Sequence, residues 1–110
     1  MFIAMNRFKV RPESTEEFET IWKSRETHLA TLPGFRSFRL LQGPAHDDHA
    51  LYASHTIWAS KADFEAWTHS EAFRMAHKDA GSHRHIYLGP PQFEGFEVVI
   101  GELPEEAESA

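Results

Sequence analysis

The chain has 110 residues, of which 41% are hydrophobic and 13% aromatic, so it fits one compact domain and leaves little room for a second. Its 17 acidic and 11 basic residues give a formal net charge of -6, which argues against nucleic acid or an anionic membrane as a partner, because both require clustered Lys and Arg. The absence of cysteine excludes disulfides, thiolate metal sites and cysteine nucleophiles, so a bound metal must use His or oxygen ligands.

The same composition indicates where the protein works. No segment reaches the roughly 20 consecutive apolar residues of a membrane span. The apolar run at the N-terminus is too short for a signal peptide. We therefore expect a cytoplasmic protein.

The first predicted elements are a strand and a helix. Residues 2–10 alternate in hydrophobicity, which predicts a strand. One face of this strand holds Phe2, Ala4, Asn6, Phe8 and Val10. Ser14 and Glu17 have the spacing of a capping box, and apolar residues recur at helical spacing over 18–32. We expect a capped helix that ends at Pro33–Gly34.

A hairpin and a second helix follow. Residues 35–43 and 50–58 are rich in β-branched and aromatic side chains, which predicts two strands joined across a polar turn. Ser60 is a predicted N-cap for a helical stretch that extends to about residue 78. Because Ser70 has the features of a second N-cap, we expect this stretch to break there.

The C-terminal part completes the topology. It is predicted to contain a loop over 79–92, a strand over 93–100 and an acidic, disordered tail over 102–110. The resulting order predicts an α+β, ferredoxin-like split βαβ domain over residues 1–101, with both helices on one face of an antiparallel sheet. Since so short a chain has nothing left to cover the other face, we expect a homodimer that packs sheet against sheet as a dimeric α+β barrel.

Three residues are candidates for a binding site. Asn6 places an amide among apolar neighbours, and an unpaired buried amide costs about 1–3 kcal/mol, so it should have a hydrogen-bond partner. His77 lies near small or apolar residues, which suit a flat hydrophobic ligand. Each candidate also has a structural interpretation: Asn6 as a satisfied strand residue, Trp67 as a core indole, and His77 as a partner of the helix dipole.

Five short segments carry a resemblance to a known family. They are Met5-Asn6-Arg7-Phe8-Lys9-Val10, Pro33-Gly34-Phe35, Phe64-Glu65-Ala66-Trp67, Ala76-His77 and Phe93-Glu94-Gly95-Phe96-Glu97-Val98-Val99. Over about residues 1–101 the chain resembles the dimeric ferredoxin-like haem-degrading monooxygenases of the IsdG and HmuQ type, which are related to antibiotic-biosynthesis monooxygenases. The asparagine, tryptophan and histidine are what mark the haem-degrading branch.

The resemblance implies a role for each candidate. His77 resembles the axial ligand of the haem iron, and Asn6 resembles the hydrogen-bond donor beside the oxygen site. Trp67 resembles the wall that forces the porphyrin out of plane, which makes these three the expected catalytic residues. Arg25 resembles a basic residue near the pocket, and His83 belongs to a basic loop that we expect to hold the propionates. That loop contains Lys78, His83, Arg84 and His85.

The same resemblance implies the chemistry. Haem would be both substrate and cofactor, with O2 and electrons from a reductase or ascorbate as the other reactants. A protein controls the reactivity of haem through the axial ligand, distal hydrogen bonds, burial and distortion of the ring. Each candidate residue matches one of these factors. The expected products are a biliverdin-type bilin and free iron, as in iron acquisition from haem.

Three alternatives stay open at this stage. A cofactor-free monooxygenase of the same fold, acting on an aromatic small molecule, would use Asn6 and Trp67 without an axial His77. A non-catalytic haem-binding protein would bind haem without turnover. A zinc site would combine His83 and His85 with His69 or His77, although this spacing is a weak metal signature.

Overall fold

The computed structural model describes residues 1–25, 28–77 and 80–102, so that Lys78 and almost all of the predicted tail lie outside the described residues. The described residues form one antiparallel sheet with the strand order β2-β3-β1-β4. The strands are β1 (Phe2–Val10), β2 (Phe35–Ala45), β3 (Ala50–Trp58) and β4 (Gln92–Glu97). This order confirms the predicted α+β, ferredoxin-like fold.

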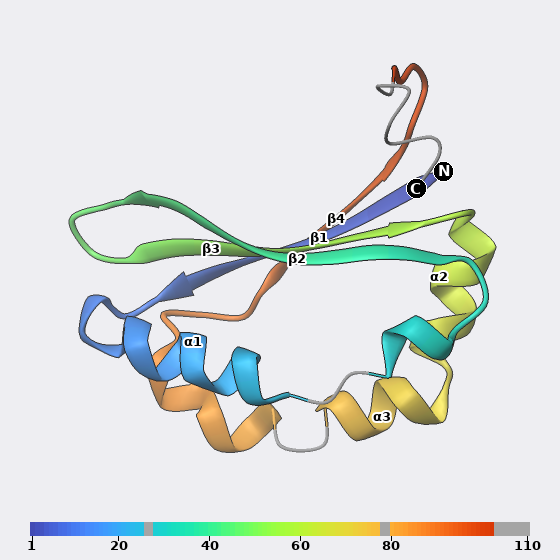
Figure 1. Cartoon of the computed structure of the whole chain (residues 1–110). Coiled ribbons are helices and arrows are strands. Elements are labelled where there is room, and N and C mark those ends of the chain that lie inside the picture. Colours follow the sequence, from blue (N-terminus) through green and yellow to red (C-terminus); the bar gives the residue numbers. More distant parts are fainter. Residues whose placement is uncertain (26–27, 78–79, 103–110) are drawn as a thin grey trace.

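The helices pack against one face of the sheet, and the other face carries no helix among the described residues (Figure 1). They are α1 (Thr15–Ser24), α2 (Lys61–Thr68) and α3 (Glu71–His77), with short 3₁₀ segments at Pro12–Ser14, Leu29–Thr31 and Ala80–Ile86. None of the helices in the described part of the chain is long and apolar enough to cross a membrane.

Two apolar clusters form the core on the helical face, at opposite ends of β1. The first core cluster consists of Phe8, Val10, Phe18, Tyr52 and Ile86. The second core cluster consists of Phe2, Ala4, Leu29 and Trp58. The even-numbered residues of β1 thus face the helices, as the alternation predicts. Asn6 has the same parity and lies on β1 between the two clusters.

The first helix is shorter than predicted. It ends at Ser24, whose hydroxyl donates to the carbonyl oxygen of Ile21 at 3.0 Å, and Arg25 then turns to extended backbone. Leu29 therefore packs in the second core cluster and not on the α1 face. The capping box was also wrong, because the 3₁₀ turn at Pro12–Ser14 precedes the helix and the Ser14 side chain makes no capping bond.

The break in the second helical stretch is confirmed. The Ser60 hydroxyl accepts from the backbone N–H of Asp63 at 3.1 Å and caps α2. The Ser70 hydroxyl accepts in the same way from the N–H of Phe73 at 3.1 Å, so α3 begins as a separate helix. These two caps mark the starts of two separate helices, α2 and α3.

The C-terminal part departs from prediction at two places. The expected loop over 79–92 contains the 3₁₀ segment Ala80–Ile86, which is held by the fully buried side chain of Ile86. The last strand ends at Glu97 and not at residue 100, because Glu97 pairs with Phe2, the first residue of β1, and only the N–H of Val98 reaches further, to the carbonyl oxygen of Met1 at 2.9 Å. Val99 and Ile100 are consequently 90% and 86% exposed.

Candidate functional site

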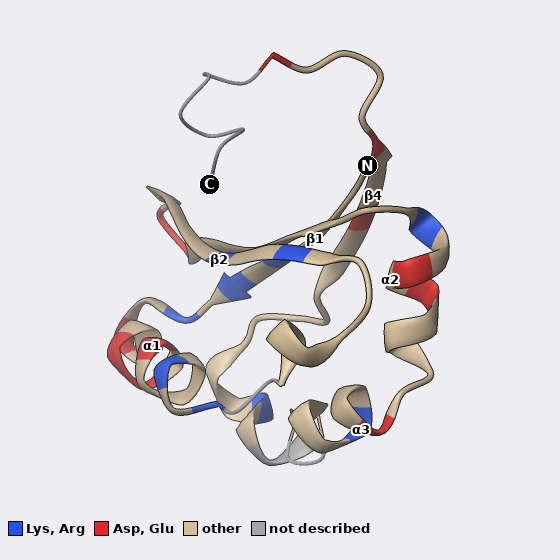
Figure 2. Cartoon of the chain, turned by 45° about the vertical axis from the view of Figure 1, so that its right-hand side comes forward, with Lys and Arg blue, Asp and Glu red and all other residues tan. Residues whose placement is uncertain are grey.

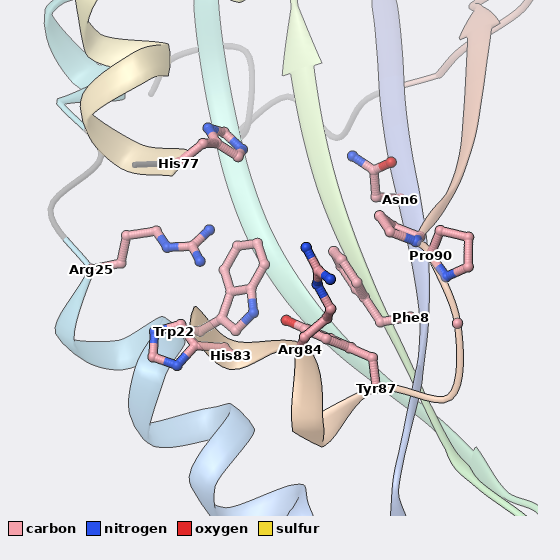
Figure 3. A pocket seen from close by; sticks show the side chains of 11 residues that line it. Asn6, Phe8, Trp22, Arg25, His77, His83, Arg84, Tyr87 and Pro90 are labelled. Carbon is pink, nitrogen blue, oxygen red and sulfur yellow. The ribbon is translucent and has the colours of Figure 1, made fainter. Parts of the chain in front are cut away.

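A cavity of about 650 Å³ opens between the middle of the sheet and the segments that cover it, and Figure 3 shows its lining side chains. It is lined by Asn6, Phe8, Trp22, Arg25, His77, His83, Arg84, Tyr87, Gly89, Pro90 and Pro91. A smaller cavity of about 60 Å³ adjoins it and shares Asn6, Trp22, Arg25 and His77 with it. Trp67 lines the smaller cavity. All five residues predicted for the site, Asn6, Arg25, Trp67, His77 and His83, therefore surround the two joined cavities.

His77, the last residue of α3, lines both cavities with a defined tautomer. Its Nδ1 lies 2.8 Å from the carbonyl oxygen of Phe73. Because a carbonyl oxygen only accepts, Nδ1 carries the proton, and Nε2 of the neutral ring keeps its lone pair. The Phe73 ring stacks on the imidazole with the ring centres 4.2 Å apart. A histidine held in this way is prepared to bind a metal ion through Nε2.

Asn6 faces His77 from the opposite wall of the cavity (Figure 3). Its side chain is half-buried on the helical face of β1. Among the described residues, none provides a hydrogen-bond partner for its amide, in contrast to the partner that the sequence led us to expect. The amide is thus available to a molecule inside the cavity.

Trp67 forms a rigid wall of the smaller cavity. Its ring packs against Trp58 and Phe64 at centre distances of 5.5 and 6.0 Å, and against the edge of Phe73 at 4.8 Å. Its buried indole N–H has no partner in the described part of the chain. Trp67 therefore connects the second core cluster to the pair of rings, Phe73 and His77, on α3.

The charge of the cavity differs from that of the chain. Its lining contains two arginines and two histidines but no carboxylate, while acidic residues lie on the helices α1 and α2 (Figure 2). The Arg25 guanidinium lies 4.2 Å from the centre of the Trp22 ring, and burial lowers the pKa of Arg25. No carboxylate of a described residue forms an ion pair with Arg25 or Arg84. These two side chains provide sites for an anionic group.

The basic loop contributes only part of its predicted set. His83 and Arg84 line the cavity. His85 pairs instead with Glu17, its Nε2 lying 2.9 Å from the carboxylate. Lys78 lies outside the described residues.

Several lining residues were not predicted from the sequence. Trp22 lies in the lining beside Arg25, which leaves the helix and packs on its ring, and no local spacing predicts this contact. Phe8 shares the strand face of Asn6, which could have identified it, and Tyr87 gave no signal in the sequence. Burial raises the pKa of Tyr87, against the opposing effects of Trp22 and Arg25, so the phenol is neutral and can donate a hydrogen bond into the cavity.

The zinc alternative finds no support in the arrangement of the side chains. In residues 1–25, 28–77 and 80–102 there is no group of three or more His, Asp or Glu side chains that could hold a metal ion. One of the proposed zinc ligands, His85, has its Nε2 within hydrogen-bond distance of the Glu17 carboxylate. A metal that needs one protein ligand, as the iron of haem can, does not require such a group.

Comparison with known proteins identifies the family. A model of the family "Antibiotic biosynthesis monooxygenase" matches residues 1–79. The chain belongs to this family. Within it, the chain is 30% identical over 80 residues to a haem oxygenase (staphylobilin-producing) of Staphylococcus haemolyticus, a match that covers 72% of this chain and 75% of that protein. The resemblance inferred from the sequence is thereby confirmed.

Two solved structures of oxygen-dependent or haem-degrading proteins share the fold. The haem degrader MhuD of Mycobacterium tuberculosis, solved with two haems in its active site, has a TM-score of 0.68 and 25% identity, covering 93% of this chain and 99% of MhuD. SnoaB of Streptomyces nogalater, a cofactor-independent oxygenase, has a TM-score of 0.67 and 23% identity, covering 94% and 97%. Since one fold serves both chemistries, the choice between them rests on the side chains of the cavity.

Proposed function

We propose that this antibiotic biosynthesis monooxygenase family member binds haem in the 650 Å³ cavity and degrades it oxidatively. The observation that carries the proposal is the pair of residues on opposite walls. His77 has its Nδ1–H bound to Phe73 and its Nε2 lone pair free, and Asn6 offers an amide without a protein partner among the described residues. This arrangement would provide one nitrogen ligand for a metal ion and one hydrogen-bond donor on the facing wall.

The lining of the cavity fits haem in shape and charge. Haem is a flat apolar ring with two carboxylates, and the cavity offers flat apolar surfaces from Phe8, Trp22 and Pro90. Arg25 and Arg84 lie in the same lining without ion-pair partners among the described residues, and guanidinium groups bind carboxylates through paired hydrogen bonds. A site that offered only the apolar walls would not account for these two unpaired cations.

Each residue has a role that follows from its position. Bound haem supplies the iron that activates O2, with electrons from an external reductant such as a reductase or ascorbate, and the proposed products are a biliverdin-type bilin and free iron. His77 would hold the iron through Nε2, since its Nδ1 is bound to the carbonyl oxygen of Phe73. Asn6 would donate a hydrogen bond from the facing wall without being a strong acid, which would favour oxidation of the ring. Trp67, held by Trp58 and Phe64, would form a fixed wall at the smaller cavity beside the bound haem.

A titration with hemin tests the proposal. The wild-type protein should shift the Soret band with saturable stoichiometry, and His77→Ala should abolish the histidine-ligated spectrum. His69→Ala is the matched control, because His69 is an exposed histidine that lines neither cavity. Addition of ascorbate in air should then remove the Soret band and produce bilin absorption. Binding without this loss would instead identify a non-catalytic haem-binding protein.

A cofactor-independent oxygenase is the second candidate, favoured by the shared fold with SnoaB. It would keep Asn6, Trp67 and Tyr87 as the polar and aromatic lining but would not need the free Nε2 of His77. In that case hemin would produce no Soret shift, and His77→Ala would leave the spectrum unchanged.

We further propose that the chain works as a homodimer. The sheet face opposite the helices carries apolar residues on three adjacent strands, since Ile3 of β1 pairs with Ile57 of β3 on one side and Phe96 of β4 on the other. The Phe96 residue is 44% exposed, and Leu41 on β2 is 38% exposed. A second copy packed on this face would cover these residues in an isologous interface.

Sedimentation equilibrium tests the dimer. The wild-type protein should have twice the chain mass of 12.6 kDa, and Ile57→Lys should shift it to the monomer. Glu16→Lys is the control, because it places the same side chain on the exposed surface of α1. A wild-type monomer at micromolar concentration would exclude the proposal.

A further inference from the structure

Ser54 lies beside Asn6 on the floor of the smaller cavity. It is the residue of β3 directly opposite Asn6 in the β1–β3 register. Both side chains line the 60 Å³ cavity, and Ser54 is only 8% exposed. Serine is otherwise rarely buried, and its neighbours on the lining are the aromatic rings of Trp22, Phe38 and Trp67.

The hydroxyl of Ser54 has no hydrogen-bond partner among the described residues, and neither has the amide of Asn6. Thr56, the next residue of β3 on the same face, differs because its hydroxyl donates to the carbonyl oxygen of Ala4 at 3.4 Å. Directly opposed residues of an antiparallel pair have Cβ atoms about 4.5–5.5 Å apart, which allows contact through a direct hydrogen bond or one bridging water. A cavity of 60 Å³ has room for such a water.

The chemistry of the two groups allows a bond in either direction. A side-chain amide has one accepting oxygen and two N–H donors, and a hydroxyl donates one proton and also accepts. In Figure 3 the NH2 group of Asn6 points to the side on which His77 lies, and Oδ1 points to the other side. If Asn6 rotated freely, its oxygen would point to the side of His77 for part of the time and repel an accepting ligand.

We propose that Ser54 is a positioning residue for Asn6. Its hydroxyl bonds through one bridging water to the side-chain amide of Asn6 and holds the amide with its N–H groups on the side that His77 faces. The Asn6 amide has this orientation in the ligand-free protein, so this part of the proposal does not depend on haem. The consequence of the orientation for a ligand on iron rests on the proposed function.

A pair of isosteric variants isolates the hydroxyl. Ser54→Thr keeps it and Ser54→Val replaces it with a methyl group of the same shape, so both variants share any effect of added volume. Thr56→Val is the control, since it removes a hydroxyl from the same face of the same strand that is already bonded to Ala4. In ¹⁵N relaxation of the ligand-free protein, the Asn6 side-chain amide should be rigid in wild type, Ser54→Thr and Thr56→Val, and mobile in Ser54→Val.

Cyanide binding to the ferric hemin complex provides the second readout, because bound cyanide accepts a hydrogen bond at its outer atom. We expect the Kd for cyanide to rise about three- to tenfold in Ser54→Val, the size of one lost hydrogen bond, and to stay within twofold in Ser54→Thr. Equal amide mobility and equal cyanide affinity in the two Ser54 variants would overturn the proposal. If wild-type protein binds no hemin, the proposed function fails, and the relaxation measurement alone still decides the role of Ser54.

Discussion

The ends of the sheet and its middle are built in different ways. At the ends, large apolar side chains such as Phe18 and Trp58 are completely buried and contact other aromatic rings. In the middle, Asn6 and Ser54 present polar groups that no described residue satisfies, next to a cavity. Unpaired polar groups and empty volume both lower stability. The ends therefore stabilise the fold, and we propose that the middle binds a ligand.

Truncation at one end should have the largest effect on stability. Phe2 is 4% exposed in the second core cluster and lines neither cavity. Phe2→Ala should lower the free energy of unfolding by about 3–5 kcal/mol, as for other buried aromatic residues. Urea unfolding measures this change. The folded fraction should keep its hemin affinity within about threefold, because the cavity lining is unchanged, and a larger loss would mean that the two regions are coupled.

Truncation at the cavity should lower the affinity for hemin and leave the free energy of unfolding almost unchanged. The His77 side chain is exposed on α3, so His77→Ala should change the free energy of unfolding by no more than about 0.5 kcal/mol. Loss of an outer partner of a metal ligand costs 10–100-fold, so loss of the ligand itself should raise the Kd for hemin by about 100-fold. Hemin titration and urea unfolding of one preparation measure both quantities. Unchanged affinity would remove His77 from the site.

The cationic lining should contribute less than the axial ligand. Arg25→Gln removes a charge without an ion-pair partner among the described residues and should raise the Kd for hemin about tenfold. The effect should shrink at high ionic strength, because salt screens the attraction to carboxylates. Arg36→Gln, on the exposed side of β2, is the control and should have no effect. An equal effect of both substitutions would indicate general attraction and no carboxylate site.

The pH linkage of Tyr52, in the first core cluster, should have the smallest effect on stability at neutral pH. Burial and the hydrogen bond to Glu19 raise the pKa of Tyr52 from 10.0 to about 12. Because the folded protein holds this proton more tightly than the unfolded chain, the stabilisation is complete below pH 10 and is lost as the pH rises towards 12. Tyr52→Phe should therefore lose less stability between these pH values than wild type, as measured by urea unfolding. If the free energies of unfolding of wild type and Tyr52→Phe changed equally between pH 10 and pH 12, this linkage would be refuted.

The sequence predicted those features that depend on local pattern. The parity of β1, the hairpin, and the two serine caps at Ser60 and Ser70 were recognisable because each arises from residues close together in the chain. The order of the elements then determined the fold. Asn6 and His77 were identified because one breaks the apolar alternation and both matched a family motif. Their proximity across the cavity followed only from the fold.

The features that were missed depend on contacts between distant segments. Leu29 has helical spacing, yet it joins a different cluster because the chain leaves the helix at Arg25 and this residue packs on Trp22. The end of the last strand is set by the length of β1 and not by the apolar residues that follow. Ser54 gave no signal because an isolated strand serine is unremarkable until the register sets it opposite Asn6.

Mass spectrometry of the products after aerobic incubation with hemin and ascorbate tests the central claim most directly. Haem degradation predicts that the tetrapyrrole is recovered as an oxygen-containing open-chain bilin, with iron released in equal amount, and that His77→Ala yields neither product. Recovery of intact hemin from the wild-type reaction, with the Soret band preserved, would contradict the proposed function.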